Sequence, residues 1–567
     1  MITNREMLFP WSDESRFSLS HGLWRSDAPG HTLSVSKESS VHSGPEAACR
    51  LVALSDVGDV EKFLTPVLEG LLGLQEREAT SDFFGCFRWY FEESHIADTN
   101  AAFFIGLNLI VLQQGYSGRL DSRNRDCLRH MFEAMDVWFD RQVRHASGFY
   151  PNKFLGDLVC SWLLKEILDR KPDSTLLSVM GESGAYWRTS PWGWGEHLSD
   201  LYAAIMLNEL SSLLLIARRL PEGLRRLYTE LLRDLLAIED AYAQGPRVPA
   251  IRTYAFTYPT PSSPFRSFVR PAEDWNATLQ NAKGVPHLRM FSFGSFFHRH
   301  GWHDLAGSVS AAKNKITIAC YGGVEATAQV ENDFRIGSLS RFPVMPHTDH
   351  QQWGLSWQSM PVAFCGEKRN WGFLRWHARE RDIDRYHPAW EKRHAYLHNA
   401  LTDSTNPPIV GQTRSRQEAM RVVILREMRS IAGAWQKLGD GWDIVEFSGK
   451  VMQEIVCLGG WSRLHLQLEG GRDLALFHFS LNVQCAPALT QSGNNLSWRV
   501  TASQESLKVQ SRFCQIWLVG ESGDPDPILQ QVPTLQTYPL WEKRKLCWAA
   551  FPNGIEFIFG DYGWEVS

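Results

Sequence analysis

The chain has 567 residues, which is too long for one compact core and predicts two large domains, or one very large repeat domain with a companion. Its composition, with 44% hydrophobic and 21% charged residues, is that of a globular protein and not of a disordered chain. The formal net charge of -5 gives no reason to expect binding to nucleic acid or to a membrane.

The N-terminus, the cysteines and the tryptophans give weaker indications. The sequence after Met1 is polar and lacks the apolar run of a signal peptide, and no stretch has the length of a membrane span. The ten cysteines are scattered without a C-x-x-C pair, which argues against a disulfide framework, so we expect a cytoplasmic protein. Aromatic rings stack on sugars, but the 23 tryptophans more commonly serve as core residues.

The N-terminal half of the sequence predicts helices. The first 50 residues are rich in Ser, His and Gly without periodicity, and are expected either to wrap the first domain or to be partly disordered. From about Val57 to Trp302, short amphipathic stripes at helical spacing are separated by loops with Gly and Pro. Strands do not alternate with helices, so a doubly wound sheet is not expected. The clearest stripes lie within residues 131–139, 154–162, 198–206 and 224–235.

The pattern changes after about Ser308. Residues 464–468 alternate strictly between apolar and polar, and residues 474–483 form an apolar run of strand length. The Asn553-Gly554 pair predicts a tight hairpin turn. We therefore expect a segregated α+β fold, with helices first and antiparallel strands second. The predicted segments are an N-terminal extension (1–56), a helical domain (57–307) and an antiparallel β-domain (308–567).

The first candidate functional loop, residues 87–93, lies between two predicted helices. It combines aromatic and acidic residues with Arg88, and Asp98 and Asn100 follow. A cation flanked by aromatic rings and carboxylates could bind a sugar acid. The alternative is that the loop only leads into a helix, for which Asp98 is the N-terminal cap.

The second candidate loop, residues 187–197, holds three tryptophans, two glycines and the adjacent pair Glu196 and His197. It precedes the predicted helix of residues 198–216. A helix N-terminus lowers the pKa of a nearby histidine and favours an anion, so His197 could neutralise or deprotonate a substrate there. The alternative is that His197 only caps the helix and that the tryptophans only pack.

The third candidate loop, residues 245–258, places Arg252 close to Tyr254. A neighbouring cation favours the phenolate and so lowers the pKa of a tyrosine. Such a tyrosine can donate or accept a proton. The alternative is an ordered aromatic loop without a chemical role.

Histidines gather at the start of the β-domain. Residues 341–358 contain His347 and His350 in an H-x-D-H sequence, and six of the 19 histidines lie between His347 and His398. Imidazole and carboxylate groups suit a divalent metal such as zinc, and calcium is also left open. Equally, one histidine could be a catalytic base, because no H-E-x-x-H or other closed ligand set is present.

The order of these elements resembles the heparinase II/III-like superfamily of polysaccharide lyases, from about residue 57 to the C-terminus, by layout more than by motif. The resemblance implies an (α/α) toroid followed by a β-sandwich, and β-elimination of polysaccharides that contain uronic acid. In that family an Asn and often a His neutralise the substrate carboxylate. A Tyr from a later toroid loop acts as acid or base, and a His from the β-domain completes the site.

Carried onto this chain, the resemblance implies that Asn152, His197, Tyr254 and His350 are catalytic, with His347 as the competitor of His350. The family's Asn-His dipeptide is missing, and Glu196-His197 stands near where one is expected. Masking of the carboxylate charge makes the proton beside it acidic enough for Tyr254 or His350 to remove. The residues expected to bind substrate are Arg88, Trp192, Trp194, Glu196, Arg252, His347, Trp353 and Trp357.

Three other functions stay open, because a fold does not decide a reaction. A glycoside hydrolase would pair Glu196 with Asp98 or Glu92 at a separation suited to inversion or retention. A catalytically silent carbohydrate-binding protein, or an intracellular biosynthetic enzyme with a non-sugar substrate, could use the same cleft. In each carbohydrate-based interpretation the partner is a carbohydrate, with no nucleic acid and no membrane, and homo-oligomerisation is left open.

Overall fold

The structure is a computed structural model that divides into two compact units, Met1–Asp240 with Ser262–Ala311 and Ala241–Pro261 with Ala312–Ser567. The predicted domain bounds, 57–307 and 308–567, stay a prediction. The residues that the structure describes are 14–26, 40–57, 60–145, 150–192, 196–242, 247–251, 301, 314–331, 334–342, 344, 360–366, 369–380, 383–384, 411–429, 437–458, 461–481, 483–509, 512–521, 536–538, 543–548, 551–560 and 563–566.

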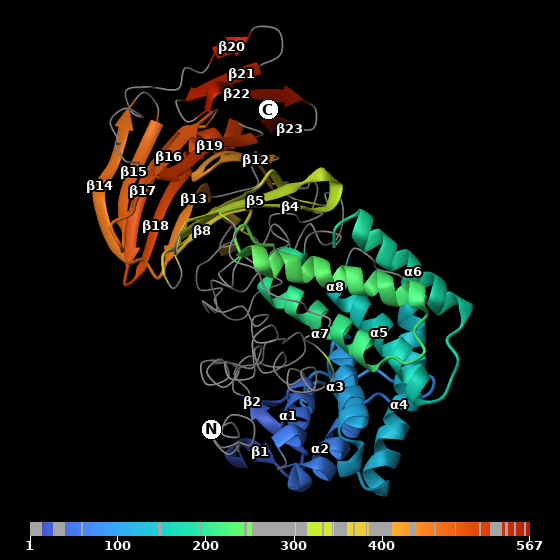
Figure 1. Ribbon diagram of the computed structural model, residues 1–567. Helices are drawn as coiled ribbons and strands as arrows, with labels where there is room; N and C mark the ends of the chain where they lie inside the picture. Colours follow the sequence, from blue (N-terminus) through green and yellow to red (C-terminus); the bar gives the residue numbers. More distant parts are fainter. Residues whose placement is uncertain are drawn as a thin grey trace. The chain divides into compact units, whose positions relative to one another are not determined.

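The described part of the first unit is mainly helical (Figure 1). Helix α3 is apolar on nearly every side and is buried, with α1 and α5 packed against it, while α5 also packs against α4 and α7. A helix without a polar face belongs in a protein interior, so α3 lies at the centre of this packing. The helices are α1 (Gly44–Val57), α2 (Glu61–Leu74), α3 (Ala101–Gly115), α4 (Ser122–Val143), α5 (Pro151–Ile167), α6 (Ser174–Thr189), α7 (Asp200–Ile216) and α8 (Glu222–Tyr242).

Several helices begin at residues suited to that position. The Asp121 side chain accepts a hydrogen bond from the Asn124 backbone N–H at the start of α4 (2.8 Å), and Ser199 accepts one from Tyr202 at the start of α7 (3.3 Å). Helix α5 has Pro151 as its first residue, where its missing N–H costs no hydrogen bond. These local signals fix where α5 and α7 start, and both starts carry candidate site residues.

The N-terminal extension has structure of its own where it is described. A 3-10 turn, η1 (Glu14–Arg16), precedes the strands β1 (Phe17–Ser18), β2 (Leu23–Ser26) and β3 (Val41–His42), which form a small antiparallel sheet. Trp24 is fully buried, and its ring lies 5.0 Å from that of Phe63 on α2. The first helix begins at Gly44, before the predicted start of the helical domain at Val57.

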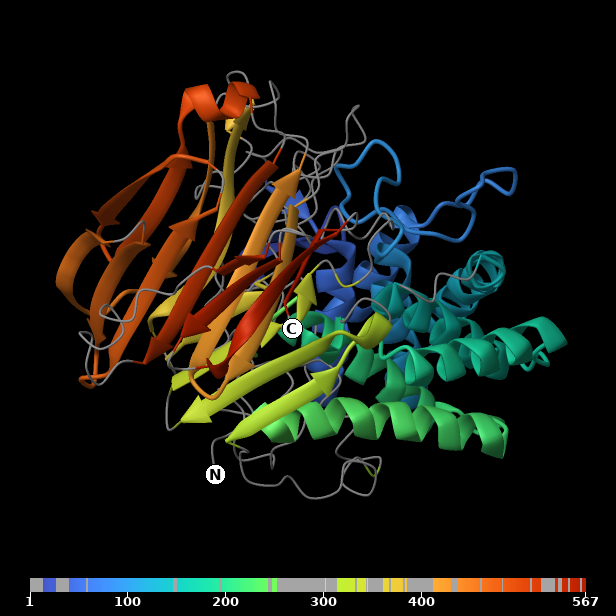
Figure 2. The same ribbon diagram turned by 90° about the horizontal axis from the view of Figure 1, so that it is seen from above.

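The larger sheet of the second unit has nine strands among the described residues, in the order β17-β18-β13-β9-β8-β6-β5-β4, with β10 paired to β9. In Figure 2, β4 and β5 are drawn in yellow-green at the end of this sheet. Its strands are β4 (Lys315–Ala319), β5 (Glu325–Glu331), β6 (Phe334–Leu339), β8 (Val362–Cys365), β9 (Trp371–Glu380), β10 (Ile383–Asp384), β13 (Lys437–Val445), β17 (Cys485–Ser492) and β18 (Asn495–Ala502).

Two further antiparallel sheets are described in this unit. One has the order β14-β15-β16-β19-β12-β11-β7, and the other has the order β20-β21-β22-β23. A short helix, α15 (Gln504–Val509), connects β18 to β19. The strands are β7 (Arg341–Phe342), β11 (Gly411–Glu418), β12 (Arg421–Arg429), β14 (Gly449–Leu458), β15 (Trp461–Leu468), β16 (Asp473–Ser480), β19 (Arg512–Glu521), β20 (Gln536–Tyr538), β21 (Lys543–Trp548), β22 (Phe551–Gly560) and β23 (Gly563–Val566).

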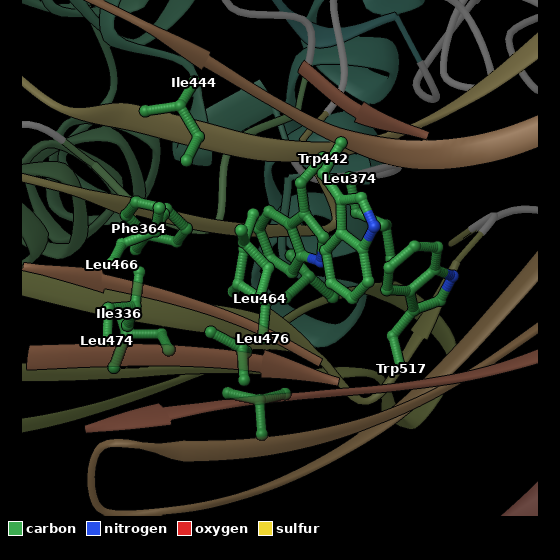
Figure 3. Packing of buried hydrophobic residues seen from close by; sticks show 14 of the residues in the cluster. Ile336, Phe364, Leu374, Trp442, Ile444, Leu464, Leu466, Leu474, Leu476 and Trp517 are labelled. Atoms are coloured by element: carbon green, nitrogen blue, oxygen red, sulfur yellow. The ribbon is translucent and has the colours of Figure 1, made fainter. Parts of the chain in front are cut away.

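A hydrophobic core joins the two larger sheets (Figure 3). Phe364 and Trp442 come from the nine-stranded sheet, while Leu464, Leu466 and Trp517 come from the seven-stranded one. The strict alternation predicted for residues 464–468 is confirmed, since the leucines are buried and the residues between them are partly exposed. Two antiparallel sheets around a shared core form a β-sandwich, so the predicted fold class, a helical domain followed by a β-sandwich, is confirmed.

The hairpin predicted at Asn553-Gly554 is wrong. Strand β22 continues through both residues, and its register against β21 changes between Leu546, which pairs with Ile555, and Trp548, which pairs with Phe551. Three residues of β22 therefore face one residue of β21, as in a β-bulge. Bulges accept the same conformationally permissive residues as tight turns, so the dipeptide marks an irregularity of the strand instead of its end.

None of the helices within the described residues combines the length and the hydrophobicity that a membrane span requires.

Candidate active site

Asn152 and Glu196 form a buried pair in the helical unit. The Asn152 backbone N–H donates to Glu196 Oε2 at 3.0 Å, and the Asn152 side-chain Nδ2 donates to Glu196 Oε1 at 2.5 Å. Both side chains are almost completely buried. Each carboxylate oxygen thus accepts one N–H, an arrangement that suits the ionised form because a carboxylate is an acceptor at both oxygens.

The position of each residue in its helix explains the pair. Asn152 follows Pro151 in the first turn of α5, where backbone N–H groups have no partner within the helix. Glu196 lies in a 3-10 turn, η3 (Glu196–Leu198), directly before α7. The carboxylate therefore caps the N-terminus of α5 from a distant part of the chain, and the positive end of the helix dipole favours its charge.

His197 follows Glu196 in turn η3 and is buried. The sequence left open whether His197 caps the following helix, and the structure assigns that cap to Ser199. As the residue after Glu196, His197 is carried by the same turn directly before α7. The sequence named all three residues as candidates, and the structure brings them to one place.

The side chains of Lys153 and Asp157, one turn apart on α5, form a buried pair next to Asn152. Lys153 Nζ donates to Asp157 Oδ2 at 2.6 Å, and Lys153 also contacts Gln142 of α4 at 3.3 Å. Burial raises the pKa of Asp157, and Lys153 opposes this shift. Burial works against the charged form of Lys153, but the charge and hydrogen bond of Asp157 outweigh it, so the pKa of Lys153 is raised. Lys153 therefore stays positively charged at neutral pH.

Asn100, which follows the first candidate loop, contacts the residue before α5. Its side-chain amide donates to Tyr150 Oη at 3.3 Å, directly before α5, and its backbone N–H donates to Asp98 Oδ1 at 2.9 Å. Asp98 therefore accepts a backbone N–H at the entry to α3, as the alternative capping role expects, while Asn100, the residue directly before the helix, makes no side-chain cap. Asn100 and the second candidate loop thus both contact the start of α5, at Tyr150 and Asn152.

Arg88 is engaged within its own loop. Its guanidinium donates to the backbone carbonyls of Gly73 (3.0 Å), Phe91 (3.1 Å) and Glu93 (2.7 Å). Three carbonyl acceptors hold this side chain in place and use much of its donor capacity. A role for Arg88 in binding a sugar acid stays a prediction, and it would require the guanidinium to leave these partners.

Trp192 is buried against Trp187 of α6, with ring centroids 5.8 Å apart and an angle of 17° between the ring planes. Trp192 also has a positive φ of 47°, which fixes an unusual turn after α6. A stacking subsite needs an accessible ring face, so a substrate could use Trp192 only after this packing opens. Its predicted role in binding stays a prediction.

The remaining predicted site residues lie outside the described residues. They are Trp194, Arg252, Tyr254, His347, His350, Trp353 and Trp357.

The acidic partners proposed for a hydrolase are held elsewhere. Glu92 accepts from the His42 backbone N–H (2.9 Å) and contacts His42 Nδ1 (2.5 Å). Asp98 is bonded to the backbone of Asn100. The pairings of Glu196 with Glu92 or Asp98 therefore gain no support from these contacts.

Glu209 is a buried acidic residue near Glu196 that the sequence interpretation missed. It lies on α7, is completely buried, and neither carboxyl oxygen has a hydrogen-bond partner among the described residues. Burial, followed by the charges of Asp157 and Glu196, raises the pKa of Glu209 well above its usual range. The sequence contained an indication of its unusual position, because Glu209 is the only charged residue between Leu201 and Ile216 in an otherwise apolar helix.

Within the described part of the chain, no cluster of three or more His, Cys, Asp or Glu side chains has a geometry that could hold a metal ion. The histidines on which the metal hypothesis rested, His347 and His350, lie outside that part. The zinc or calcium site therefore stays a prediction.

Fold and site together define a protein of two units, a helical domain with a buried amide–carboxylate cluster and an antiparallel β-sandwich. No protein-family model matches the chain, and no curated protein matches it in sequence. Among solved structures, a mutant of the heparan sulfate lyase HepC from Pedobacter heparinus is similar, with a TM-score of 0.36 and 11% sequence identity over 92% of this chain and 81% of that chain. This is a distant structural similarity, and the activity has to be argued from the chain's own residues.

Proposed function

We propose that this chain is a carbohydrate lyase that cleaves oligo- or polysaccharides containing uronic acid by β-elimination. The observation that supports it is the fixed geometry of Asn152, whose amide is held by Glu196 beside His197. The three residues stand where two helices begin, and helix N-termini favour bound anions. A substrate carboxylate is an anion that such a place could bind.

The first step of the reaction, removal of a proton, requires hydrogen-bond donors at the substrate carboxylate. The hydrogen on the carbon next to a uronate carboxylate is a very weak acid, because its removal places a second negative charge on the same group. Donors that stabilise this developing charge lower the barrier. The Asn152 amide, oriented by Glu196, and the imidazole of His197 are the donors assigned to this task.

The bond changes balance without an oxidant or a reductant. A base removes the proton next to the carboxylate, and the electron pair left behind forms a C=C bond. The neighbouring C–O bond then breaks, and the leaving oxygen takes up a proton. We assign base and acid to Tyr254 and His350, as the family resemblance implies, although both lie outside the described residues.

The burial of the site has a consequence for this proposal. Asn152, Glu196 and His197 are almost inaccessible to solvent, so a sugar reaches them only when the protein opens. Low solvent exposure also strengthens each hydrogen bond to a developing charge. The same burial that limits access thus favours the chemistry once a substrate is bound.

The experiment follows ultraviolet absorbance while the purified protein is incubated with a panel of uronic-acid oligosaccharides and polymers. The C=C bond conjugated to the carboxylate absorbs in the ultraviolet, whereas a hydrolysis product does not. Matched samples are assayed for new reducing ends. The proposal is supported if absorbance rises with the wild-type protein and the rate of this rise is lower on the order of a hundredfold or more in both Asn152→Ala and His197→Gln. A loss of this size is seen when one oxyanion donor is removed.

His145→Gln is the matched control, because His145 is exposed just after α4 and should leave the rate unchanged. New reducing ends without absorbance would overturn the lyase and assign the chain to the hydrolases. No turnover with any sugar of the panel would also overturn it, in favour of a binding protein or an enzyme with a non-sugar substrate.

A further inference from the structure

Glu209 is the most unusual ionisable group in the described part of the helical unit. Its side chain is completely buried on α7, and neither carboxyl oxygen finds a hydrogen-bond donor among the described residues. An ionised carboxylate in that situation would lose its hydration without compensation, which is strongly unfavourable. A group kept under such conditions calls for an explanation beyond packing.

The close packing at Gly156 shows part of the surroundings of Glu209. On α5, Gly156 leaves the space that the carboxyl occupies, because a Cβ at that position would lie 2.7 Å from Glu209 Oε1. The same Cβ would lie 2.7 Å from the ring of Phe103, an apolar residue on α3. Glu209 Oε1 and the Phe103 ring therefore both lie close to the Cα of Gly156, and neither the glycine Cα nor the ring provides a hydrogen bond.

The charges around Glu209 are mostly of its own sign. Asp157 on α5 and Glu196 on turn η3 both act on it as negative charges. Lys153 is the positive group beside them, and it is paired with Asp157. Burial, followed by the negative charges of Asp157 and Glu209, raises the pKa of the Cys160 thiol on α5.

Among the described residues, three ionised carboxylates beside the single charge of Lys153 would leave two negative charges uncompensated in a buried space. Binding of one proton reduces this repulsion, and the proton is most favourably bound by the carboxyl group that accepts the fewest hydrogen bonds. Glu196 accepts two N–H groups from Asn152, and Asp157 accepts from Lys153, whereas Glu209 accepts none among the described residues. Like-charged carboxylates sharing a site commonly resolve in this way.

We propose that Glu209 is held as an uncharged carboxylic acid at neutral pH and acts as a positioning residue for the Asn152–Glu196 pair. Without a charge on Glu209, Glu196 keeps the ionised form whose two oxygens orient the Asn152 amide. Loss of the Glu209 proton places like charge beside Glu196 and weakens that orientation. The inference rests on the proposed function only for the use of Asn152, and its test needs no substrate.

The first measurement is an infrared difference spectrum between the wild-type protein and Glu209→Gln at pH 7. Gln has nearly the same shape as a protonated Glu, so the variant should fold. The expected result is loss of the C=O stretching band of a protonated carboxylic acid. Glu133→Gln, an exposed change in the middle of α4, should remove only carboxylate bands. Loss of carboxylate bands in Glu209→Gln would overturn the proposal.

A second variant assigns the proton if Glu209→Gln folds poorly. Asp157 is the other buried carboxyl whose pKa burial raises, so Asp157→Asn is compared in the same way. At pH 7 the acid band should persist in Asp157→Asn. In the wild-type protein the band should disappear as the pH is raised. An acid band that is lost in Asp157→Asn belongs to Asp157, and this result would overturn the assignment to Glu209.

The positioning role is read from the side-chain amide of Asn152 by nuclear magnetic resonance, with asparagine labelled with nitrogen-15 and the signal assigned through Asn152→Ala. In the wild-type protein the signal should move as alkaline pH removes the Glu209 proton. In Glu209→Gln it should stay in place. A signal with the same pH dependence in both proteins would show that Glu209 does not act through this pair.

Discussion

Asn152 and Glu196, 44 residues apart in the chain, are joined by two hydrogen bonds that couple the start of α5 to the turn before α7. One bond comes from the backbone and one from the side chain, so the carboxylate fixes both the helix terminus and the amide. A residue that holds a helix terminus and a functional side chain at once links stability to activity. Changes at Asn152 should therefore be visible in both.

Replacement of Asn152 by aspartate should destabilise the protein more than replacement by alanine. Alanine removes one donor from a buried carboxylate, whereas aspartate also places a second negative charge against it. We expect the aspartate variant to lose about 3 kcal/mol or more, the usual size for an uncompensated buried charge. Urea unfolding at pH 7 measures both variants against the wild-type protein. Equal midpoints for the two variants would contradict this account of the pair.

Gly156 should tolerate no side chain, because a Cβ there would lie 2.7 Å from both Glu209 Oε1 and the ring of Phe103. Gly156→Ala is expected to cost about 1–3 kcal/mol as an overpacked core. Gly73→Ala on α2 is the matched control, since a Cβ at Gly73 meets nothing within 4 Å. Alanine is the better helix former, so the control should be neutral or stabilising by up to about 1 kcal/mol. Thermal unfolding of the two variants distinguishes these outcomes, and a stabilised Gly156→Ala would refute the close packing.

Local sequence patterns were sufficient for the fold class and for part of the site. The apolar alternation of residues 464–468 reflects burial of one face of a strand, and the apolar residues of α7 reflect burial of the helix on nearly every side. Glu196 and His197 were found because they precede this apolar helix. Their contact with Asn152 depends on how α5 packs against α7, and no local pattern contains that information.

Other features could not be read from the sequence for identifiable physical reasons. The backbone acceptors that hold Arg88, such as the Gly73 carbonyl, are invisible in a sequence, and its binding role stays a prediction. Asn553-Gly554 predicted a turn because the same backbone freedom serves turns and bulges. Glu209 was missed because a single acid in an apolar helix breaks the helical pattern only weakly.

The β-sandwich contains a buried ion pair, and the effects of substituting its two residues on stability should not be additive. Arg426 donates to both oxygens of Asp440 at 2.9 Å, and both residues are almost fully buried. Asp440→Asn leaves the guanidinium without its counter-charge and should cost about 3–5 kcal/mol. Replacing both residues with leucine and methionine should cost less than the single change, because no buried charge remains. A double variant as unstable as Asp440→Asn would contradict this expectation, and urea unfolding measures both.

A second buried polar group of the sandwich, His478 on β16, should make stability depend on pH. Its side-chain Nε2 contacts Gln515 on β19, and its ring lies 4.6 Å from that of Trp517. Burial lowers the pKa of His478 to about 4, and the hydrogen bond with Gln515 only partly opposes this shift. The folded protein therefore keeps His478 neutral at a pH at which the unfolded chain has already taken up a proton.

The sign of the effect follows from this difference. Between the ordinary histidine value of 6.5 and about 4, the unfolded chain binds the proton and the folded protein does not. The contribution of His478 to stability is therefore complete above pH 6.5 and declines as the pH falls toward 4. At pH 5 the loss is about 2 kcal/mol by proton linkage. Urea unfolding at pH 8 and pH 5 should show a smaller decline in His478→Gln than in the wild-type protein, and an unchanged decline in the exposed control His145→Gln. An equal decline in all three proteins would mean that His478 titrates alike in the folded and unfolded states.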